Sequence, residues 1–123
     1  MILFDTSAWI GLMRASGQVF LDALGDTDVF THDCVIGELA LGSLPQRGVT
    51  LLRLSELSRL PNASHAEIRT LIETNQLWGR GIGYVDVQLL AALRLSPGVG
   101  LLTRDTRLAD IATELNIAAQ IAP

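Results

Sequence analysis

Two short apolar runs constrain the fold of this chain more than any other feature. The runs 2–4 and 99–103 do not alternate apolar and polar residues, which is typical of strands buried on both faces of a parallel sheet. Each run leads into an acid, Asp5 or Asp105, and a helical apolar spacing follows at once. Open α/β sheets bind ligands at the carboxyl ends of their strands, so both acids are candidate site residues if the two strands are neighbours.

Both acids also have a purely structural interpretation. Asp is favoured in strand-to-helix turns and at the start of a helix, where its carboxylate accepts a free backbone N–H. The spacing of Trp9, Leu12 and Met13 predicts that the first helix begins with Thr6 or Ser7 as its cap. Asp105 is an equally good cap for the last helix.

The rest of the chain has a mainly helical spacing. We expect helices over about 18–24, 33–42, 51–60, 64–78, 84–93 and 106–115, and strands over 29–31 and 117–121. The helix from Asp33 is apolar nearly all round and should be largely buried. The helices over 51–60 and 64–78 should form a helical hairpin. Strands separated by helices predict one α/β domain over residues 1–123, with a central parallel sheet covered by helices on both faces.

Composition excludes several functions. The net charge is −4, so the chain has no global positive field to attract nucleic acid, and a phosphate-bearing substrate must be held by local arginines or bound cations. All nine basic residues are Arg, which excludes a P-loop, Schiff-base or phospho-receiver lysine. The single cysteine, Cys34, excludes an internal disulfide and a Cys-based zinc site. We expect a cytoplasmic protein with no membrane association, because no apolar stretch reaches spanning length.

Two further acids lie among apolar residues. Asp86 is followed at helical spacing by Leu89, Leu90 and Leu93, so its carboxylate is on the apolar face of its own helix. Glu38 likewise shares a predicted face with apolar neighbours. Charged groups are rarely buried unless they are paired or bind a metal. The alternative is that each acid forms a buried ion pair with an arginine.

The four acids Asp5, Glu38, Asp86 and Asp105 together favour a bound cation. No comparable set of buried bases accompanies them, and uncompensated like charges would raise one another's pKa values. Mg²⁺ or Mn²⁺ fits best because the candidate ligands are hard oxygens, while the two histidines have no ligand spacing. Carboxylate sites of this kind activate water and hold phosphodiester oxygens in many nucleases.

In this interpretation Asp5 and Asp86 are the main metal ligands, and Asp105 completes the site or holds a second metal. Glu38 would orient or deprotonate the attacking water. Local positive charge would come from the cation, helped by Arg80, Arg104 or Arg107, although a solvated surface position is the favoured interpretation for each of these arginines.

Four motifs, in order, resemble those of a known family. They are Asp5-Thr6-Ser7 after the opening strand, the segment 35–42 around Glu38, the segment 77–86 ending at Asp86, and the segment 103–108 around Asp105. In this order and spacing the motifs resemble the PIN-domain ribonucleases and, more narrowly, the VapC toxins of bacterial toxin–antitoxin modules. The likeness extends over essentially the whole chain.

The resemblance implies a three-layer α/β/α PIN-like fold and a Mg²⁺- or Mn²⁺-dependent endoribonuclease acting on RNA. It also implies a cognate antitoxin that occludes the acidic pocket, and a homodimer. The four acids match the family's acidic quartet, with Thr6, Ser7 and Thr103 as supporting hydroxyls. Asp33 stands where relatives often have proline, and we expect it to cap its helix rather than to add charge near the site.

Two other interpretations are kept open. An aspartyl phospho-acceptor or phosphatase would use Asp5 as a nucleophile, but the chain lacks a receiver lysine and the second Asp of the DxD phosphatase motif. A non-catalytic PIN-fold scaffold would serve only to bind a partner. Its signature would be a lost acid, and none of the four is lost.

Overall fold

A parallel sheet with β1 at its centre organises the molecule. The computed structural model describes residues 1–120, and its strands are β1 (Ile2–Phe4), β2 (Val29–Thr31), β3 (Ser58–Arg59) and β4 (Gly100–Leu102). All are parallel, in the order β3-β2-β1-β4. In register, Ile2 lies between Val29 and Gly100. The two strands that lead into Asp5 and Asp105 are therefore neighbours, as the ligand-site prediction requires.

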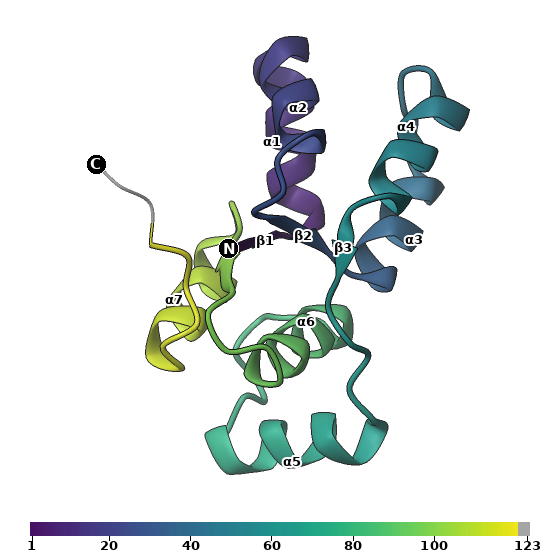
Figure 1. Cartoon of the computed structure of the whole chain (residues 1–123). Helices are drawn as coiled ribbons and strands as arrows, with labels where there is room; N and C mark the ends of the chain where they lie inside the picture. The colour runs from purple at the N-terminus through teal and green to yellow at the C-terminus, as the bar shows by residue number, and fades with distance from the viewer. Residues whose placement is uncertain (121–123) are drawn as a thin grey trace.

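Helices cover the sheet on both sides. They are α1 (Thr6–Ala15), α2 (Gly17–Leu24), α3 (Asp33–Leu41), α4 (Arg47–Ser55), α5 (His65–Asn75), α6 (Tyr84–Arg94) and α7 (Thr106–Glu114). Figure 1 shows α1 and α2 on one side of the sheet, with α5 and α6 on the other. This arrangement confirms the predicted three-layer α/β/α fold with a central parallel sheet. No helix within residues 1–120 combines the length and the apolar character needed to cross a bilayer.

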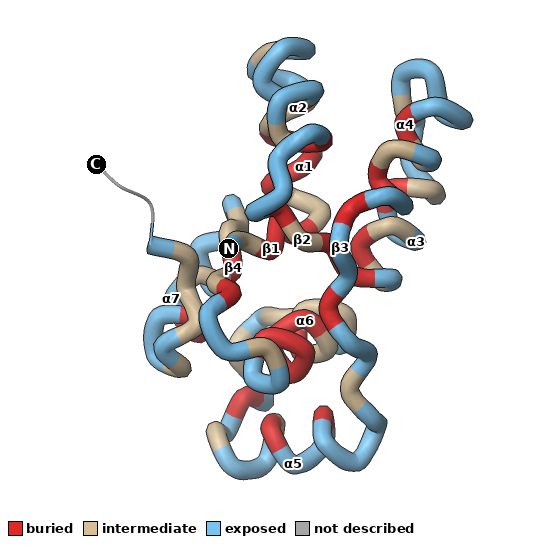
Figure 2. Tube along the Cα trace, viewed as in Figure 1, coloured by how far each residue is buried: buried red, intermediate tan, exposed pale blue. Residues whose placement is uncertain are grey.

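The core lies directly behind the strand that ends at Asp5. Leu3 on β1, Trp9 on α1 and Leu90 on α6 are fully buried, and Figure 2 shows α6 as the most continuously buried helix. The Trp9 ring packs edge-on against Phe4, with ring centroids 4.9 Å apart, and against Phe20 at 5.9 Å. Each such buried side chain contributes about 1.5–3 kcal/mol to stability. The carboxyl end of β1 is thus fixed by dense packing.

The helices predicted over 51–60 and 64–78 do not pack against each other as a hairpin. The helix expected over 51–60 ends at Ser55, and β3 follows before α5 begins. The backbone N–H of Leu60 donates to the Thr31 carbonyl at 2.9 Å, so this segment binds the sheet edge instead of continuing the helix. In consequence α4 packs against α3, and α5 packs against α6.

The expected burial of α3 is also wrong. Only Val35 and Leu39 on this helix are buried, whereas Glu38 is exposed and Leu41 is 91% exposed. An apolar residue count shows how hydrophobic a helix is but not how many sides of it are covered. The neighbours of α3 leave its outer surface open, and that surface remains apolar in part.

The expected last strand is reduced to a single bridge. Leu101 of β4 pairs in parallel with Ala118. The Leu101 N–H donates to the Ile117 carbonyl at 2.7 Å, and the Ala119 N–H donates to the Leu101 carbonyl at 2.8 Å. Of the predicted strand 117–121, Ile121 lies outside the described residues.

Candidate active site

Asp5 is held rigidly at the end of β1. It is 5% exposed, and it is the N-cap of α1 in place of the predicted Thr6 or Ser7. Its Oδ1 accepts from the Ala8 N–H at 2.8 Å and from the Ser7 hydroxyl at 2.7 Å. Its Oδ2 accepts from the Thr103 hydroxyl at 2.5 Å. Both carboxylate oxygens therefore have a fixed direction. Asp5 displaces the predicted caps because its extended backbone at the strand end suits the N-cap position.

Two hydroxyl side chains join the β1 and β4 ends. Ser7 Oγ and Thr103 Oγ1 are 3.2 Å apart. The Arg104 N–H donates to Ser7 Oγ at 2.9 Å, and the Asp105 N–H donates to Thr103 Oγ1 at 3.1 Å. The turn that carries Asp105 is thus tied to the residues that hold Asp5.

Asp105 is the N-cap of α7, as its structural interpretation predicts. Its Oδ1 accepts from the Arg107 N–H at 2.9 Å and from the Leu108 N–H at 3.4 Å. The residue is exposed. Because the cap uses one carboxylate oxygen for both N–H groups, capping and ligand binding are compatible at this position.

Asp86 lies half-buried in the first turn of α6. Its Oδ2 accepts from the Gly83 N–H at 3.0 Å. Burial raises the pKa of Asp86, and the charges of Asp105, Asp5 and Glu38 raise it further, while the Gly83 bond acts in the opposite direction. The other three predicted acids therefore all act electrostatically on Asp86, which places the four in one region at the carboxyl edge of the sheet.

Glu38 reaches this region from the surface. The prediction that it lies on a buried apolar face is wrong, because the residue is exposed. The Thr6 hydroxyl donates to Glu38 Oε1 at 2.6 Å, which connects the start of α1 to α3. Each of the three predicted supporting hydroxyls therefore donates to an acid of the quartet. Thr6 donates to Glu38, whereas Ser7 and Thr103 donate to Asp5.

The ion-pair alternative for the four acids does not hold within residues 1–120. The ion pairs there are Arg59–Asp33, Arg69–Glu73 and Arg80–Glu114. None includes a member of the quartet. Arg80 is bound by both carboxylate oxygens of Glu114, at 2.7 and 2.8 Å, which commits its guanidinium to α7.

Asp33 is not the cap of α3. The buried His32 caps that helix through Nδ1, which accepts from the Cys34 N–H at 3.0 Å. Asp33 instead accepts from Arg59 at 3.0 Å and from Asn62 at 2.9 Å. The sequence contained little signal for this, because His is less common than Asp as an N-cap.

The donor chemistry of the quartet fits a hard divalent cation. Burial raises the pKa of Asp86, and the charges of three other carboxylates raise it further. A cation bound among these carboxylates would relieve that repulsion. Within residues 1–120, however, no three His, Cys, Asp or Glu side chains are gathered tightly enough to form a metal-binding group. The ligand set Asp5, Asp86 and Asp105 therefore stays a prediction, and closing the site would require side-chain movement.

A parallel sheet with carboxylates at its carboxyl edge is the architecture expected of a PIN-like nuclease. No protein-family profile matches the chain. The chain is 44% identical, over 118 residues, to ribonuclease VapC32 of Mycobacterium tuberculosis, from both strain CDC 1551 / Oshkosh and strain H37Rv. The alignment covers 96% of this chain and 95% of the relatives. The chain belongs to the VapC family of PIN-domain ribonucleases.

Proposed function

We propose that this protein is a Mg²⁺- or Mn²⁺-dependent endoribonuclease that acts as the toxin of a toxin–antitoxin pair. The observation that carries the chemistry is the half-buried Asp86, whose pKa is raised by burial and by three other carboxylates. The relatives named ribonuclease VapC32, aligned over nearly the full chain, support RNA as the substrate.

Each side chain of the site has a proposed role. Asp5 and Asp86 are the main metal ligands, and Asp105 completes the set or holds a second ion. A bound divalent cation would neutralise this charge, activate water and hold phosphate oxygens. Glu38 accepts the proton of the attacking water, with Thr6 orienting its carboxylate at 2.6 Å. Ser7 and Thr103 keep the Asp5 carboxylate in one orientation.

The partners follow from family membership. We infer that residues 1–123 act as one PIN domain in the cytoplasm, that the protein forms a homodimer, and that a cognate antitoxin covers the acidic pocket with a basic side chain. Large apolar side chains on α2, α3 and α4 are exposed and available for protein contacts. They are Val19, Leu21, Leu41, Val49 and Leu52.

The test is cleavage of single-stranded RNA by the purified protein. Wild type should cleave in Mg²⁺ or Mn²⁺ and should stop in EDTA. Asp5→Asn should lose cleavage, because it removes a charged ligand, and should keep its fold, because Asn is as good an N-cap as Asp. Mapping the cleavage sites on total cellular RNA, with Asp5→Asn as control, would identify the target. Equal cleavage rates for the variant and wild type would contradict the assignment.

A further inference from the structure

Two arginines near Asp105 each lie across a glycine. A Cβ atom at Gly11 of α1 would lie 2.5 Å from Nη1 and 2.6 Å from Cδ of Arg104. A Cβ atom at Gly81, in the loop before α6, would lie 2.6 Å from Nη1 and 2.8 Å from Cδ of Arg107. Each arginine therefore lies flat on backbone that has no side chain to displace it, one on α1 and the other on the α5–α6 loop.

The backbone of each arginine is anchored to the site. The Arg104 N–H donates to Ser7, which in turn donates to Asp5. The Arg107 N–H donates to Asp105. The start of each side chain is therefore fixed relative to the candidate catalytic carboxylates, and its far end lies against a glycine.

Neither guanidinium is committed to an acid within the described part of the chain. Arg104 and Arg107 are exposed and take part in none of the ion pairs of residues 1–120, unlike Arg80 with Glu114. In a chain of net charge −4, cations beside an acidic centre are the groups most able to bind a polyanion there. An arginine fork is well suited to phosphate oxygens.

An open groove runs along α1 from Ser7, whose hydroxyl donates to Asp5. It has a volume of about 650 Å³ and is lined by Ser7, Ile10, Gly11, Arg14, Ala15 and Arg104. From Ser7 to Arg14 the helix advances about 10 Å. A chain entering this groove from the acidic edge would meet Arg104 first and Arg14 further along.

We propose that Arg104 and Arg107 bind the backbone phosphates on the two sides of the RNA bond that is cleaved. On the Arg104 side, Arg14 binds a further phosphate along the same groove. This inference rests on the proposed ribonuclease function and specifies how its substrate is held. Because these contacts are to phosphate, they position the strand without selecting its sequence. Sequence preference must then come from other residues.

The first experiment measures RNA binding without cleavage. In an Asp5→Asn background with Mn²⁺, anisotropy of a labelled single-stranded oligoribonucleotide gives the affinity of Arg104→Gln and Arg107→Gln. Each should bind about tenfold more weakly, as expected for one charged hydrogen-bonding contact. Each should also flatten the dependence of log K on log salt by about 0.7.

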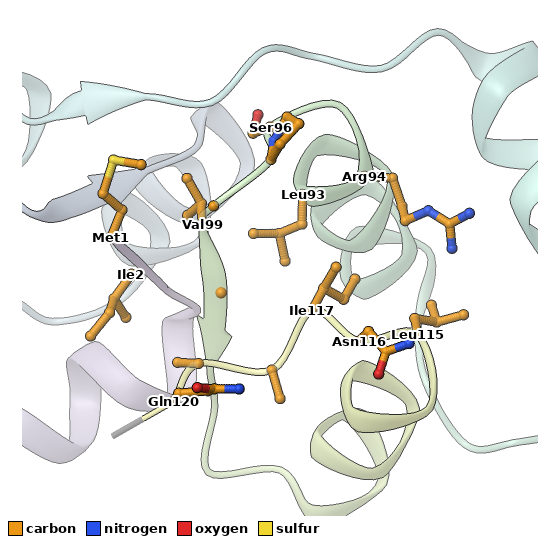
Figure 3. A pocket seen from close by; sticks show the side chains of 15 residues that line it. Met1, Ile2, Leu93, Arg94, Ser96, Val99, Leu115, Asn116, Ile117 and Gln120 are labelled. Atoms are coloured by element: carbon orange, nitrogen blue, oxygen red, sulfur yellow. The ribbon is translucent and has the colours of Figure 1, made fainter. Parts of the chain in front are cut away.

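Arg94→Gln is the matched control. It removes the same charge from the last residue of α6, which lines a cavity together with Met1 and Val99 at the amino-terminal ends of the strands. Figure 3 shows the Arg94 side chain pointing away from that cavity. It should leave the affinity unchanged. If Arg104→Gln and Arg107→Gln bind as tightly as Arg94→Gln, the inference is wrong. In the cleaving protein, the two arginine variants should raise KM more than they lower kcat.

A glycine variant tests the support beneath Arg104. Gly11→Ala adds a methyl group that collides with a flexible arginine, while alanine favours the helix. RNA affinity should fall towards that of Arg104→Gln with no loss of Tm, and unchanged affinity would contradict the Gly11 contact. A wild type that does not cleave RNA would remove the proposed function. Cleavage by wild type with unaffected arginine variants would remove this inference alone.

Discussion

Asp5 and Asp105 have two roles that the sequence presented as alternatives. Each is the N-cap of the helix that follows its strand. The end of a strand has the extended backbone that an N-cap needs, and a carboxylate there accepts helix N–H bonds while it faces the sheet edge. A capping interpretation therefore does not argue against a catalytic one. Asp86 also takes part in a helix start, because its side chain accepts the N–H of Gly83, the N-cap of α6. Glu38, which is exposed in the middle of α3, has no such role.

At Asp86 we predict that removing the charge stabilises the protein. The pKa of this carboxyl is raised in the fold, so the group favours folding below about pH 3.8, its value in the unfolded chain, and this contribution is lost as pH rises through the folded pKa. At pH 7 the charged form is therefore unfavourable. Asp86→Asn should raise Tm by a few degrees in EDTA at pH 7, while cleavage in Mn²⁺ is lost.

The measurement is thermal melting of both proteins in EDTA over a range of pH. The gain in Tm should shrink as the pH is lowered, because the wild-type carboxyl takes up a proton more readily in the folded protein than in the unfolded chain. The Asn carbonyl can still accept from Gly83, so the cap bond is retained in the variant. A Tm below that of wild type at pH 7 would show that Asp86 is not under electrostatic strain.

At the scale of elements, α3 has a cap that titrates. His32 is 1% exposed, and its Nδ1 must be unprotonated to accept from the Cys34 N–H. Burial lowers the pKa of His32, partly opposed by the charge of Asp33. Its contribution to stability is therefore complete above about pH 6.5 and is lost as pH falls through the lower folded value.

We expect His32→Asn to remove this pH dependence, because Asn caps a helix without titrating near neutral pH. Wild type should lose Tm more steeply than the variant as pH is lowered from 6.5 to 5. Melting curves followed by circular dichroism at each pH provide the comparison. Parallel pH profiles for the two proteins would exclude His32 as the titrating cap.

Local sequence patterns predict α6 correctly but not the segment after Ser55. The helix predicted over 84–93 forms α6, Tyr84–Arg94, because Gly83 precedes a long uniform helical spacing. The helix predicted over 51–60 ends at Ser55 and β3 follows. Leu57 and Leu60 have the spacing of a helix face, but they are equally compatible with burial beside a short strand. Strand β3 forms because β2 offers it an unpaired edge, and no property of residues 56–60 specifies that edge.

For the whole molecule, we predict that a divalent cation raises stability only when the acids from separate elements are intact. Asp5 follows β1, Asp86 is in α6, and Asp105 precedes α7. A ligand that binds only the native state stabilises it by about 2.7 kcal/mol at a concentration one hundred times its Kd. Wild type should therefore melt higher in Mn²⁺ than in EDTA.

The control is the Asp5→Asn and Asp86→Asn double variant, which should melt at the same temperature with and without Mn²⁺. Calorimetry at fixed ionic strength separates ion binding from general screening of the net charge of −4. An equal rise for both proteins would show that the ion binds elsewhere. No rise for either would support the scaffold interpretation.

The sequence by itself determined the components of the site. The apolar strands ending in Asp5 and Asp105, and the acid on the apolar helix at Asp86, were visible in local patterns, because burial and capping depend on near neighbours. The tertiary structure decided what those patterns cannot contain. The strand order makes β1 and β4 adjacent and so brings Thr103 to Asp5. The packing of the helices on the sheet leaves Glu38 at the surface and places Arg104 across Gly11. Contacts of this kind join segments that are distant in the sequence, so local patterns do not contain them.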